Sequence, residues 1–424
     1  MKAIWDISNK CNLHCTYCGA DACNNITEGT LSIIDIEKMI LNIKTMVDEV
    51  DLYGGEPLII KDIHKILQCF TKYNIKVNIT TNGQVNTSIL EDIVKDEIQI
   101  NSLIISMDGN ESENDKYRGL GAYRKAVNFL EKAISLKKEN GKEWNIGISA
   151  VVTDVNVKTI IHSIDLWMRK GVDFIVVSPI AEIGRACNNK NIFPSFEMLL
   201  NMYEDIACYS IKNNMQNQII IDVANPLLAE YLNAKYGTNY IVDAYGCEAA
   251  DNVVTINSYG HLKSCRSNPE IVADLKEDSL EDVYDRFSSF LRKKRLHNSI
   301  KICDCIHREV CNVCCFAVNK EKEPICYEVE KRYKKFIQNQ NIIFELDKKV
   351  CLYDDNESDF FEIFYYNTKE FVEYDSSGYK ILNLIHNNGM TSKEISDEIG
   401  VDNELVFRFL IQEHTKKHIN IIKG

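Results

Sequence analysis

Short β-rich runs alternate with longer helical patterns six times between Lys2 and about Lys212. In helical stretches such as Ile33–Val47 and Tyr123–Lys138, apolar residues recur every three or four positions. Repeated βα units build a parallel sheet, and right-handed crossovers curl that sheet toward a barrel. The sequence therefore predicts an α/β fold, a partial (β/α)6 TIM-like barrel. The expected strands are Ala3–Ile7, Asp48–Tyr53, Ile75–Thr80, Ser102–Met107, Asn145–Thr153 and Asp173–Ser178.

Three cysteines, Cys11, Cys15 and Cys18, follow the first expected strand, with three and then two residues between them. Thiolates so close together on one loop can hold three corners of a [4Fe–4S] cluster and leave the fourth iron without a protein ligand. A structural zinc site is the alternative that this spacing leaves open. Because the cysteines follow the C-terminal end of a strand, they fall on the face where such barrels place their active sites.

Further polar motifs occur at the ends of later expected strands. They are Gly54-Gly55-Glu56-Pro57, Thr80-Thr81-Asn82-Gly83, Ser106-Met107-Asp108-Gly109 and, a little further on, Tyr117-Arg118-Gly119. In this order, and together with the cysteine run, the motifs resemble those of the radical S-adenosylmethionine (SAM) enzymes over about residues 2–212. The resemblance implies that the amino and carboxylate groups of SAM chelate the open iron. One electron from the cluster would then cleave SAM to a 5′-deoxyadenosyl radical.

The same resemblance implies which side chains contact SAM. Glu56, with its neighbours in the Gly-Gly-Glu-Pro segment, would hold the methionine amino group, and Arg118 would pair with the carboxylate. Tyr17 and Val151 would lie on the adenine side, although both also suit an ordinary core. The polar residues after the later strands also suit a turn-stabilising role. The full set of expected contacts is Tyr17, Gly54, Gly55, Glu56, Pro57, Asn82, Ser106, Asp108, Arg118 and Val151.

A second group of cysteines lies between residues 247 and 326. Its spacing resembles the SPASM extension of radical SAM enzymes, although the pair at Cys303 and Cys305 is one residue shorter than in that family. The resemblance implies two auxiliary [4Fe–4S] clusters, and a cysteine-rich zinc ribbon is the alternative. The outer cluster would be held by Cys303, Cys305, Cys311 and Cys326. The inner cluster would be held by Cys247, Cys265 and Cys315, with either Cys314 as its fourth ligand or an open iron.

The remaining cysteines lie outside both groups. The chain has 16 cysteines in all, and in a reducing compartment such a number favours metal or redox roles over disulfides. We expect each of the scattered ones to be a small buried apolar side chain. They are Cys23, Cys69, Cys187, Cys208 and Cys351.

From Asn341 onward the pattern changes to three expected strands followed by three helices. The sequence predicts a small α+β, winged-helix-like module that resembles PqqD-like domains, which recognise the leader of ribosomally made peptides. In that family the leader adds as a strand beside the third strand, here near Glu370–Tyr374. A DNA-binding winged helix is the alternative. The expected elements are strands Ile342–Asp354, Phe360–Tyr366 and Glu370–Tyr374 and helices Ser376–His386, Thr391–Ile399 and Asn403–Lys416.

The chain of 424 residues, with 45% hydrophobic content, is long enough for several domains. We expect a radical SAM partial barrel over residues 1–230, a SPASM domain over 231–335 and a PqqD-like module over 340–424. The net charge of −13 argues against nucleic acid as a partner, since such proteins usually carry a basic face. With no apolar stretch long enough to span a bilayer and no signal core at the N-terminus, we expect no membrane partner and a cytoplasmic location.

These resemblances together imply a radical SAM oxidoreductase that matures peptides. It would abstract hydrogen from a ribosomally made precursor peptide, bound through its leader, and install an oxidative crosslink. A thioether is the first expected product and a C–C or C–O bond the second. Flavodoxin or ferredoxin would supply electrons, and no general acid or base can be named. The alternatives are an enzyme like the anaerobic sulfatase maturases, a small-molecule radical SAM dehydrogenase, and a non-enzymatic iron–sulfur electron carrier.

Overall fold

The computed structural model describes most of the chain. The described residues are 1–23, 31–96, 98–221, 226–238, 240, 252–266, 268, 270–297, 324–339, 343–346, 350–354, 360–365, 370–387, 389–415 and 418–422. By their contacts they fall into two compact units. Among the described residues, unit 1 comprises those from 1 to 221 and from 252 to 297, and unit 2 comprises those from 226 to 240 and from 324 to 422.

Unit 1 is built on one ten-stranded sheet, whose strand order is β10-β9-β8-β1-β2-β3-β4-β5-β6-β7. The pairs from β8 through β1 to β7 are parallel, whereas β9 pairs antiparallel with both β8 and β10. The strands are β1 Lys2–Asp6, β2 Glu49–Tyr53, β3 Lys76–Thr81, β4 Ser102–Ser106, β5 Asn145–Val152, β6 Phe174–Pro179, β7 Ile219–Ile221, β8 Val253–Ile256, β9 His261–Lys263 and β10 Ala273–Asp274.

All six predicted strands are confirmed, each to within one residue at either end. The prediction of a six-stranded sheet is too small, because the sheet continues at both edges. Strand β8 pairs with β1, with Lys2 opposite Val253, although the two strands lie far apart in the sequence. It was missed because it is only four residues long and lies among the cysteines. Short apolar runs of that kind carry no clear period.

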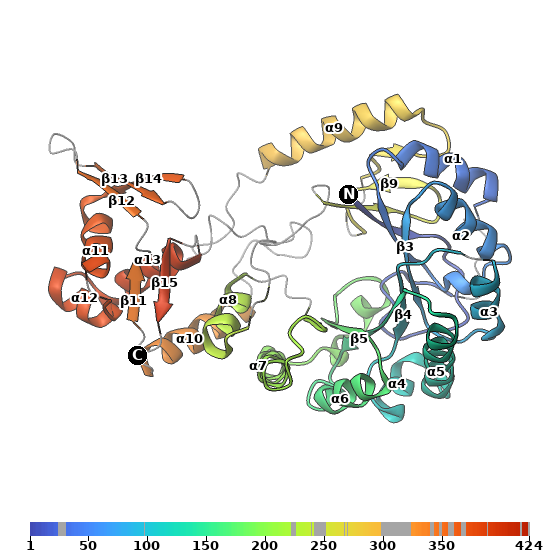
Figure 1. Ribbon diagram of the computed structural model, residues 1–424, viewed down its shortest axis with the longest axis horizontal. Coiled ribbons are helices and arrows are strands. Elements are labelled where there is room, and N and C mark those ends of the chain that lie inside the picture. Colours follow the sequence, from blue (N-terminus) through green and yellow to red (C-terminus); the bar gives the residue numbers. More distant parts are fainter. Residues whose placement is uncertain are drawn as a thin grey trace. The chain divides into compact units, whose positions relative to one another are not determined.

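Helices cover the outer side of the curved sheet, as Figure 1 shows for α1 to α6. Helix α1 begins with a capping box, in which Ser32 and Asp35 satisfy each other's backbone N–H groups. Beneath the helices the core is apolar, and Trp5 packs edge-on against Phe70 with ring centroids 5.6 Å apart. The helices of unit 1 are α1 Ile33–Ile43, α2 Ile63–Lys72, α3 Ser88–Lys95, α4 Glu111–Arg118, α5 Ala122–Asn140, α6 Ile160–Lys170, α7 Phe196–Lys212 and α9 Leu280–His297.

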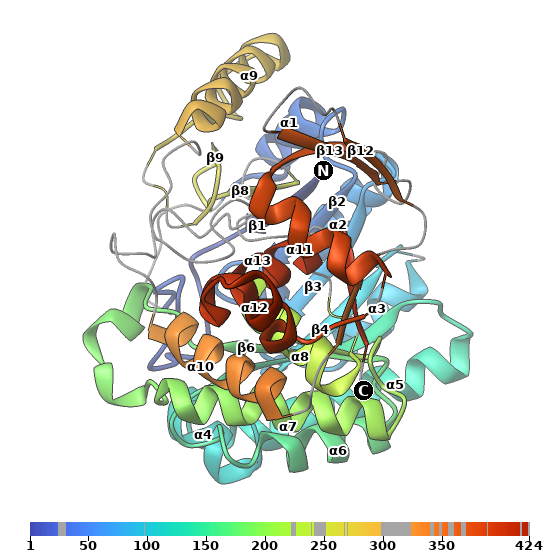
Figure 2. The same cartoon turned by 90° about the vertical axis from the view of Figure 1, so that its left-hand side faces the viewer.

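Unit 2 combines two small antiparallel sheets with helices. Strand β11 pairs with β15, and β13 lies between β12 and β14. Helices α8 and α10 lie side by side, as the labels in Figure 2 show, with Tyr231 packed against Tyr333 at 5.7 Å between centroids. The elements are α8 Pro226–Tyr236, α10 Pro324–Asn339, β11 Ile343–Leu346, β12 Val350–Asp354, β13 Phe360–Tyr365, β14 Glu370–Asp375, α11 Ser376–Asn387, α12 Ser392–Ile399, α13 Asn403–Thr415 and β15 Ile419–Ile422.

The three helices predicted for the C-terminal segment are confirmed as α11, α12 and α13. Thr391 caps α12 through a capping box with Glu394, as that segment's sequence suggests. The predicted strand Ile342–Asp354 is wrong as a single element, since it divides into β11 and β12, which belong to different sheets. Strand β15 was not predicted.

A buried polar cluster joins the two sheets of unit 2 to α13. The hydroxyls of Tyr365 and Tyr374 lie 2.9 Å apart, and Tyr374 also donates to Glu413. Nδ1 of His418 lies 2.8 Å from the Glu413 carboxylate, and the His418 ring stacks on Tyr365 with centroids 3.9 Å apart. Burial raises the pKa of both tyrosines, so their hydroxyls stay protonated and keep donating.

Candidate functional site

The cysteine run forms a loop directly after β1, at the C-terminal edge of the sheet. Cys11, Cys15 and Cys18 are all free thiols, the first buried and the other two partly exposed. The loop closes on itself, because the backbone N–H of Cys11 donates to the carbonyl of Cys23 at 3.1 Å. The Cys11 sulfur in turn accepts from the backbone N–H of Leu13 at 3.4 Å. The structure therefore brings the three predicted ligands together on one closed loop.

The three thiols can serve as ligands only after they lose their protons. Burial raises the pKa of Cys15 to about 11 and also raises that of Cys11, so bound metal has to displace their protons. Within the described ranges, no three His, Cys, Asp or Glu side chains converge as ligands of one ion. An iron–sulfur cube spreads its thiolates over separate irons, so it does not need such convergence. Three thiols on one closed loop are a donor set that fits a [4Fe–4S] group.

The Gly-Gly-Glu-Pro segment lies against the start of the cysteine loop. The backbone N–H of Gly55 donates to the carbonyl of Ser8 at 2.6 Å, and that of Glu56 donates to Lys10 at 2.9 Å. A Cβ atom on Gly55 would lie 2.0 Å from the Lys10 carbonyl oxygen. Gly54 has a φ of +127°, which a residue with a side chain rarely adopts. Both glycines are required for this close approach of backbone to backbone.

Glu56 is a buried carboxylate, 1% exposed, that links the ends of two strands. One oxygen accepts from the Thr81 hydroxyl at 2.7 Å and from the backbone N–H of Leu58 at 3.0 Å; the other accepts from the backbone N–H of Asn82 at 2.6 Å. Burial raises the pKa of Glu56 to about 7, against these hydrogen bonds, which lower it. A cation placed beside this carboxylate would therefore be favoured, because it would stabilise the ionised form.

Asn82 continues the same network toward the cysteines. Its Nδ2 donates to the Asn12 side chain at 2.9 Å and lies 3.6 Å from the Cys11 sulfur, while its Oδ1 accepts from the backbone of Gln84 at 2.8 Å. Asn12 itself donates to the carbonyl of Gln84 at 2.7 Å. Asn82 thus ties the end of β3 to the cysteine loop, and its predicted SAM contact stays a prediction.

Asp108, after β4, is the centre of a second buried network. Its carboxylate accepts from Arg118 Nε at 2.7 Å and Nη2 at 2.9 Å, from the Tyr17 hydroxyl, and from the backbone N–H of Val151 at 3.0 Å. Asn156 donates to the Asp108 carbonyl and, at 2.8 Å, to that of Val151. Asp108 therefore joins the cysteine loop, α4 and the end of β5.

Arg118 is paired differently from the sequence expectation. The expected partner is the SAM carboxylate, but the structure engages two of its nitrogens with Asp108, in a side chain that is 9% exposed. Burial lowers the pKa of this guanidinium, but Asp108, Tyr17 and Cys15 together raise it, and the net shift is upward. Tyr17 is buried and lies under the Arg118 guanidinium at 5.6 Å. A SAM contact by any of these three residues stays a prediction, and each has a defined structural role.

The last expected SAM contacts lie at the same edge of the sheet. Ser106 ends β4 and is partly exposed, and Pro57, which is buried, begins a short 3-10 turn over Pro57–Ile59. Val151 is partly buried against an apolar cluster that includes Tyr17 and Ile180. Most of the predicted SAM contacts thus follow the ends of β2 to β5, whereas Tyr17 is in the cysteine loop after β1 and Arg118 is in α4.

Of the second cysteine group, Cys265 is described in full. It is a partly exposed free thiol that accepts from the backbone N–H of Asn268 at 3.2 Å. Its neighbour Arg266 pairs bidentately with Asp6, at the end of β1, and lies 4.8 Å above the ring of Tyr53. Cys326 lies in α10, and its side chain is not described. The other predicted ligands lie outside the described residues: Cys247, Cys303, Cys305, Cys311, Cys314 and Cys315.

The expectation that the scattered cysteines are buried is wrong for two of them. Cys187 and Cys208 are exposed, and Cys23 and Cys69 are partly buried. Cys208 lies on the solvent side of α7, whose apolar face is turned inward. The side chain of Cys351 lies outside the described residues.

Sequence reasoning missed three residues of the site, Arg185, Arg266 and Asn156. Each is a lone polar residue outside the recognised motifs, and each makes its contacts to segments far away in the chain. The pairing of Arg266 with Asp6 spans 260 positions. No local pattern signals such partners, so only the fold reveals them.

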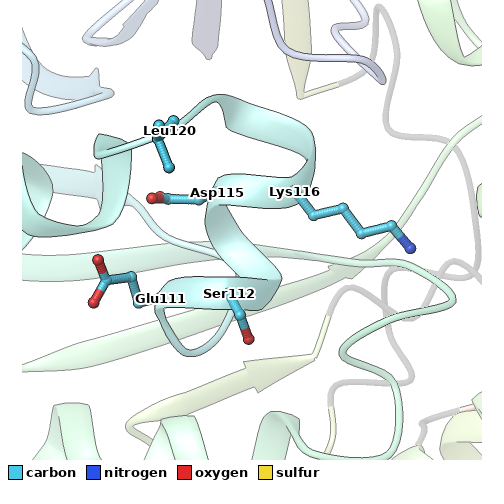
Figure 3. Close-up of a pocket in the computed structure, with 5 residues that line it drawn as sticks. All are labelled: Glu111, Ser112, Asp115, Lys116 and Leu120. Atoms are coloured by element: carbon cyan, nitrogen blue, oxygen red, sulfur yellow. The ribbon is translucent and has the colours of Figure 1, made fainter.

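Helix α4 also borders a shallow cavity of about 470 Å³, shown in Figure 3. It is lined by Glu111, Ser112, Asp115, Lys116 and Leu120. Leu120 is fully exposed, and Arg118 of the same helix is buried on Asp108. None of the residues predicted for SAM or a cluster lines this cavity, so we assign it no part in the site.

A family model and several curated proteins match part of this chain. Residues 5–166 match the family "Radical SAM superfamily". Fe-coproporphyrin III synthase of Methanosarcina barkeri is 26% identical over 190 residues, which cover 44% of this chain and 46% of that protein. Mycofactocin maturase MftC of Mycobacterium ulcerans is 30% identical over 156 residues, covering 36% and 40%. The matched stretch thus spans less than half the length of these curated relatives.

Similarity in structure extends further along the chain. SuiB of Streptococcus suis, solved with bound S-adenosylmethionine, superposes with a TM-score of 0.57 and 21% identity over 77% of this chain and 76% of SuiB. At this identity the likeness establishes the fold. In the described part of the chain, no helix combines the length and the apolar character needed to cross a membrane.

Proposed function

We propose, from the match of residues 5–166 to the radical SAM superfamily, that the protein is a radical SAM peptide maturase. It would abstract hydrogen from a ribosomally made precursor peptide and install an oxidative crosslink. The observation that carries the proposal is the closed cysteine loop, held against the Gly-Gly-Glu-Pro segment at one edge of the sheet. An accessory electron carrier has no need of this second motif.

Cys11, Cys15 and Cys18 would hold a [4Fe–4S] cluster, which, when bound, supplies the electron that cleaves SAM to a 5′-deoxyadenosyl radical. Glu56 would receive the methionine amino group. Its carboxylate already accepts three hydrogen bonds out of about four that a carboxylate can take, and a cation there would stabilise its ionised form. The other predicted contacts would orient SAM from the ends of β3 to β5.

The peptide substrate is supported by unit 2. Strand β14 is an edge strand, since within the described residues it pairs with β13 alone. An edge strand offers backbone N–H and C=O groups to an added strand, and the exposed ring of Phe371 offers an apolar contact beside them. Among the similar proteins, MftC is named as a maturase, and SuiB has also been solved with its precursor peptide SuiA.

The crosslink would be a two-electron oxidation. Hydrogen-atom abstraction removes one electron, and the auxiliary clusters would accept the second as the new bond forms and a proton leaves. Cys265 would be an inner-cluster ligand, with the other cysteines of its group as partners. A thioether between a cysteine sulfur and a carbon is the first expected product and a C–C or C–O bond the second. Flavodoxin or ferredoxin would reduce the N-terminal cluster.

The test is intact-mass analysis of a short peptide encoded beside the gene, after anaerobic incubation with reconstituted protein, SAM and reductant. Loss of two hydrogens per modified site is expected, with 5′-deoxyadenosine formed in step. The same core peptide without its leader should react at least tenfold more slowly. Formation of 5′-deoxyadenosine while the peptide mass stays constant would count against an oxidative crosslinker.

A second candidate is an enzyme acting on a small molecule. It is favoured by the similarity to Fe-coproporphyrin III synthase, whose name refers to a tetrapyrrole product. Such an enzyme has no use for a strand edge that binds a leader. Turnover of a small molecule that a β14-binding leader peptide does not inhibit would support this candidate over the peptide maturase.

A further inference from the structure

A segment after β6 lies directly against the cysteine loop. It is the short 3-10 helix Gly184–Asn188, and the backbone N–H of Arg185 donates to the carbonyl of Cys18 at 3.1 Å. Gly184 has a φ of +56°, and a Cβ atom there would lie 2.3 Å from the same carbonyl oxygen. The two segments therefore meet backbone to backbone, at a position that only glycine allows.

The side chain of Arg185 extends this contact to the rest of the loop. Its Nε donates to the carbonyl of Cys15 at 2.8 Å, and its Nη1 donates at 2.9 Å both to the carbonyl of Ala22 and to the Asp21 carboxylate. The side chain is 14% exposed. One residue thus reaches the backbone of two predicted cluster ligands and the closing end of the loop.

The hydrogen bonds from Arg185 to the loop carbonyls contribute more to holding the cysteine loop than its ion pair with Asp21 does. Asp21 is 71% exposed, and an ion pair with so exposed a partner contributes little to stability. A guanidinium, by contrast, is a rigid fork that donates in fixed directions. A loop whose carbonyls are held in this way keeps its thiols in one relative arrangement.

We propose that Arg185 is a positioning residue of the N-terminal cluster. It fixes the backbone at Cys15 and Cys18, so that the thiol groups are held in the arrangement that a cube requires. The inference rests on the proposed function, because it presupposes a cluster on this loop. Groups that orient metal ligands without touching the metal commonly change metal affinity by about 10–100-fold when they are removed.

The test compares three variants of the full-length reconstituted protein: R185Q, R185K and the control R169Q. Arg169 pairs with Asp165 on α6 and is 76% exposed, so its loss should change nothing. The readouts are the electron paramagnetic resonance spectrum of the reduced protein with and without SAM, and the rate at which a chelator removes the SAM-responsive signal. Only a cluster with an open iron changes its spectrum on binding SAM.

For R185Q we expect the SAM-responsive signal to be lost at least tenfold faster than in the wild type and in R169Q. R185K, which keeps the charge but not the fork, should be intermediate. The thermal midpoint of the iron-free protein should fall by about 2–4 °C in R185Q, for its lost hydrogen bonds, and stay unchanged in R169Q. Equal rates for R185Q and R169Q would overturn the inference, and so would a lower midpoint of iron-free R185Q without faster loss. If the wild-type protein itself shows no SAM-responsive signal, the proposed function is wrong.

Discussion

The phenol of Tyr17 donates a hydrogen bond to the carboxylate of Asp108, 91 positions further along the chain. Tyr17 stands one position before Cys18 in the cysteine loop, and Asp108 follows β4. Asp108 in turn holds Arg118 and the backbone of Val151. The cysteine loop is therefore joined to the ends of β4 and β5 by buried polar contacts.

The buried pair of Asp108 and Arg118 should respond strongly to the loss of one charge. D108N is expected to destabilise unit 1 by about 3–5 kcal/mol, because it leaves the Arg118 guanidinium buried without its carboxylate. The matched control is E111Q, since Glu111 pairs with Arg124 at the surface and should contribute less than about 1 kcal/mol. Urea unfolding monitored by circular dichroism measures both. Similar losses for the two variants would contradict the role assigned to the pair.

Gly55 should not tolerate a side chain. In G55A the new Cβ would meet the Lys10 carbonyl, so the cysteine loop must move, at a cost near the upper end of the ~1–3 kcal/mol typical of overpacking. The control is G141A, because Gly141 ends α5 in open space. We expect G55A to lose most of its N-terminal cluster, measured as the SAM-responsive paramagnetic signal. G141A should lose about 1 kcal/mol of stability and keep the signal. Full retention of the signal by G55A would refute this prediction.

Loss of the Glu56 charge should weaken SAM binding by more than the loss of its hydrogen bonds within the protein would explain. E56Q removes the negative charge, and we expect SAM to bind roughly 10–100-fold more weakly, as for the loss of one charged hydrogen bond of ~1.5–3 kcal/mol. Equilibrium dialysis of SAM against the reconstituted protein measures this. E131Q serves as the control, since Glu131 pairs with Lys170 at the surface. Unchanged SAM affinity in E56Q would assign Glu56 to loop architecture alone.

Cys265 and Cys208 offer a matched pair of free thiols. C265A should reduce the iron bound per chain while leaving the SAM-responsive signal in place, because Cys265 is proposed as a ligand of an auxiliary cluster. C208A should retain all its iron, since Cys208 is exposed on α7. Iron and sulfide analysis of both variants decides the matter. The same iron content in C265A as in C208A would exclude Cys265 as a ligand.

Unit 2 should lose stability in mild acid through His414. Burial lowers the pKa of this histidine from its usual 6.5, against the hydrogen bond to the carbonyl of Ile419, which raises it. The unfolded chain therefore takes up the proton first, and stability falls as the pH drops below 6.5. The expected loss is at most about 1.4 kcal/mol per pH unit. The unfolding midpoint of H414Q, measured between pH 5 and 7.5, should depend less on pH than that of the wild type. If the midpoints of the two proteins change with pH in parallel, His414 is not the cause of the loss.

Local sequence patterns predicted strands β1 to β6 of unit 1 well, because each has a run of apolar residues bounded by turn residues or helices. The same patterns placed Cys11, Glu56 and Asp108 at one edge, since parallel strands end together. They could not predict that Arg118 is engaged by Asp108 and that Arg185 contacts the cysteine loop. Such pairings depend on which loops the fold brings together. Strands β7 to β10 were missed because they are very short.

The pairing of β1 with β8 has a consequence for how the chain is made. Lys2 leaves the ribosome roughly 250 residues before its partner Val253. At a synthesis rate of about 5–20 residues per second, that interval lasts roughly 10–50 s. Throughout it, one side of β1 has no neighbouring strand, and an open strand edge is a site for wrong pairing with other chains. Slow translation or scarce chaperones should therefore reduce the yield of this protein.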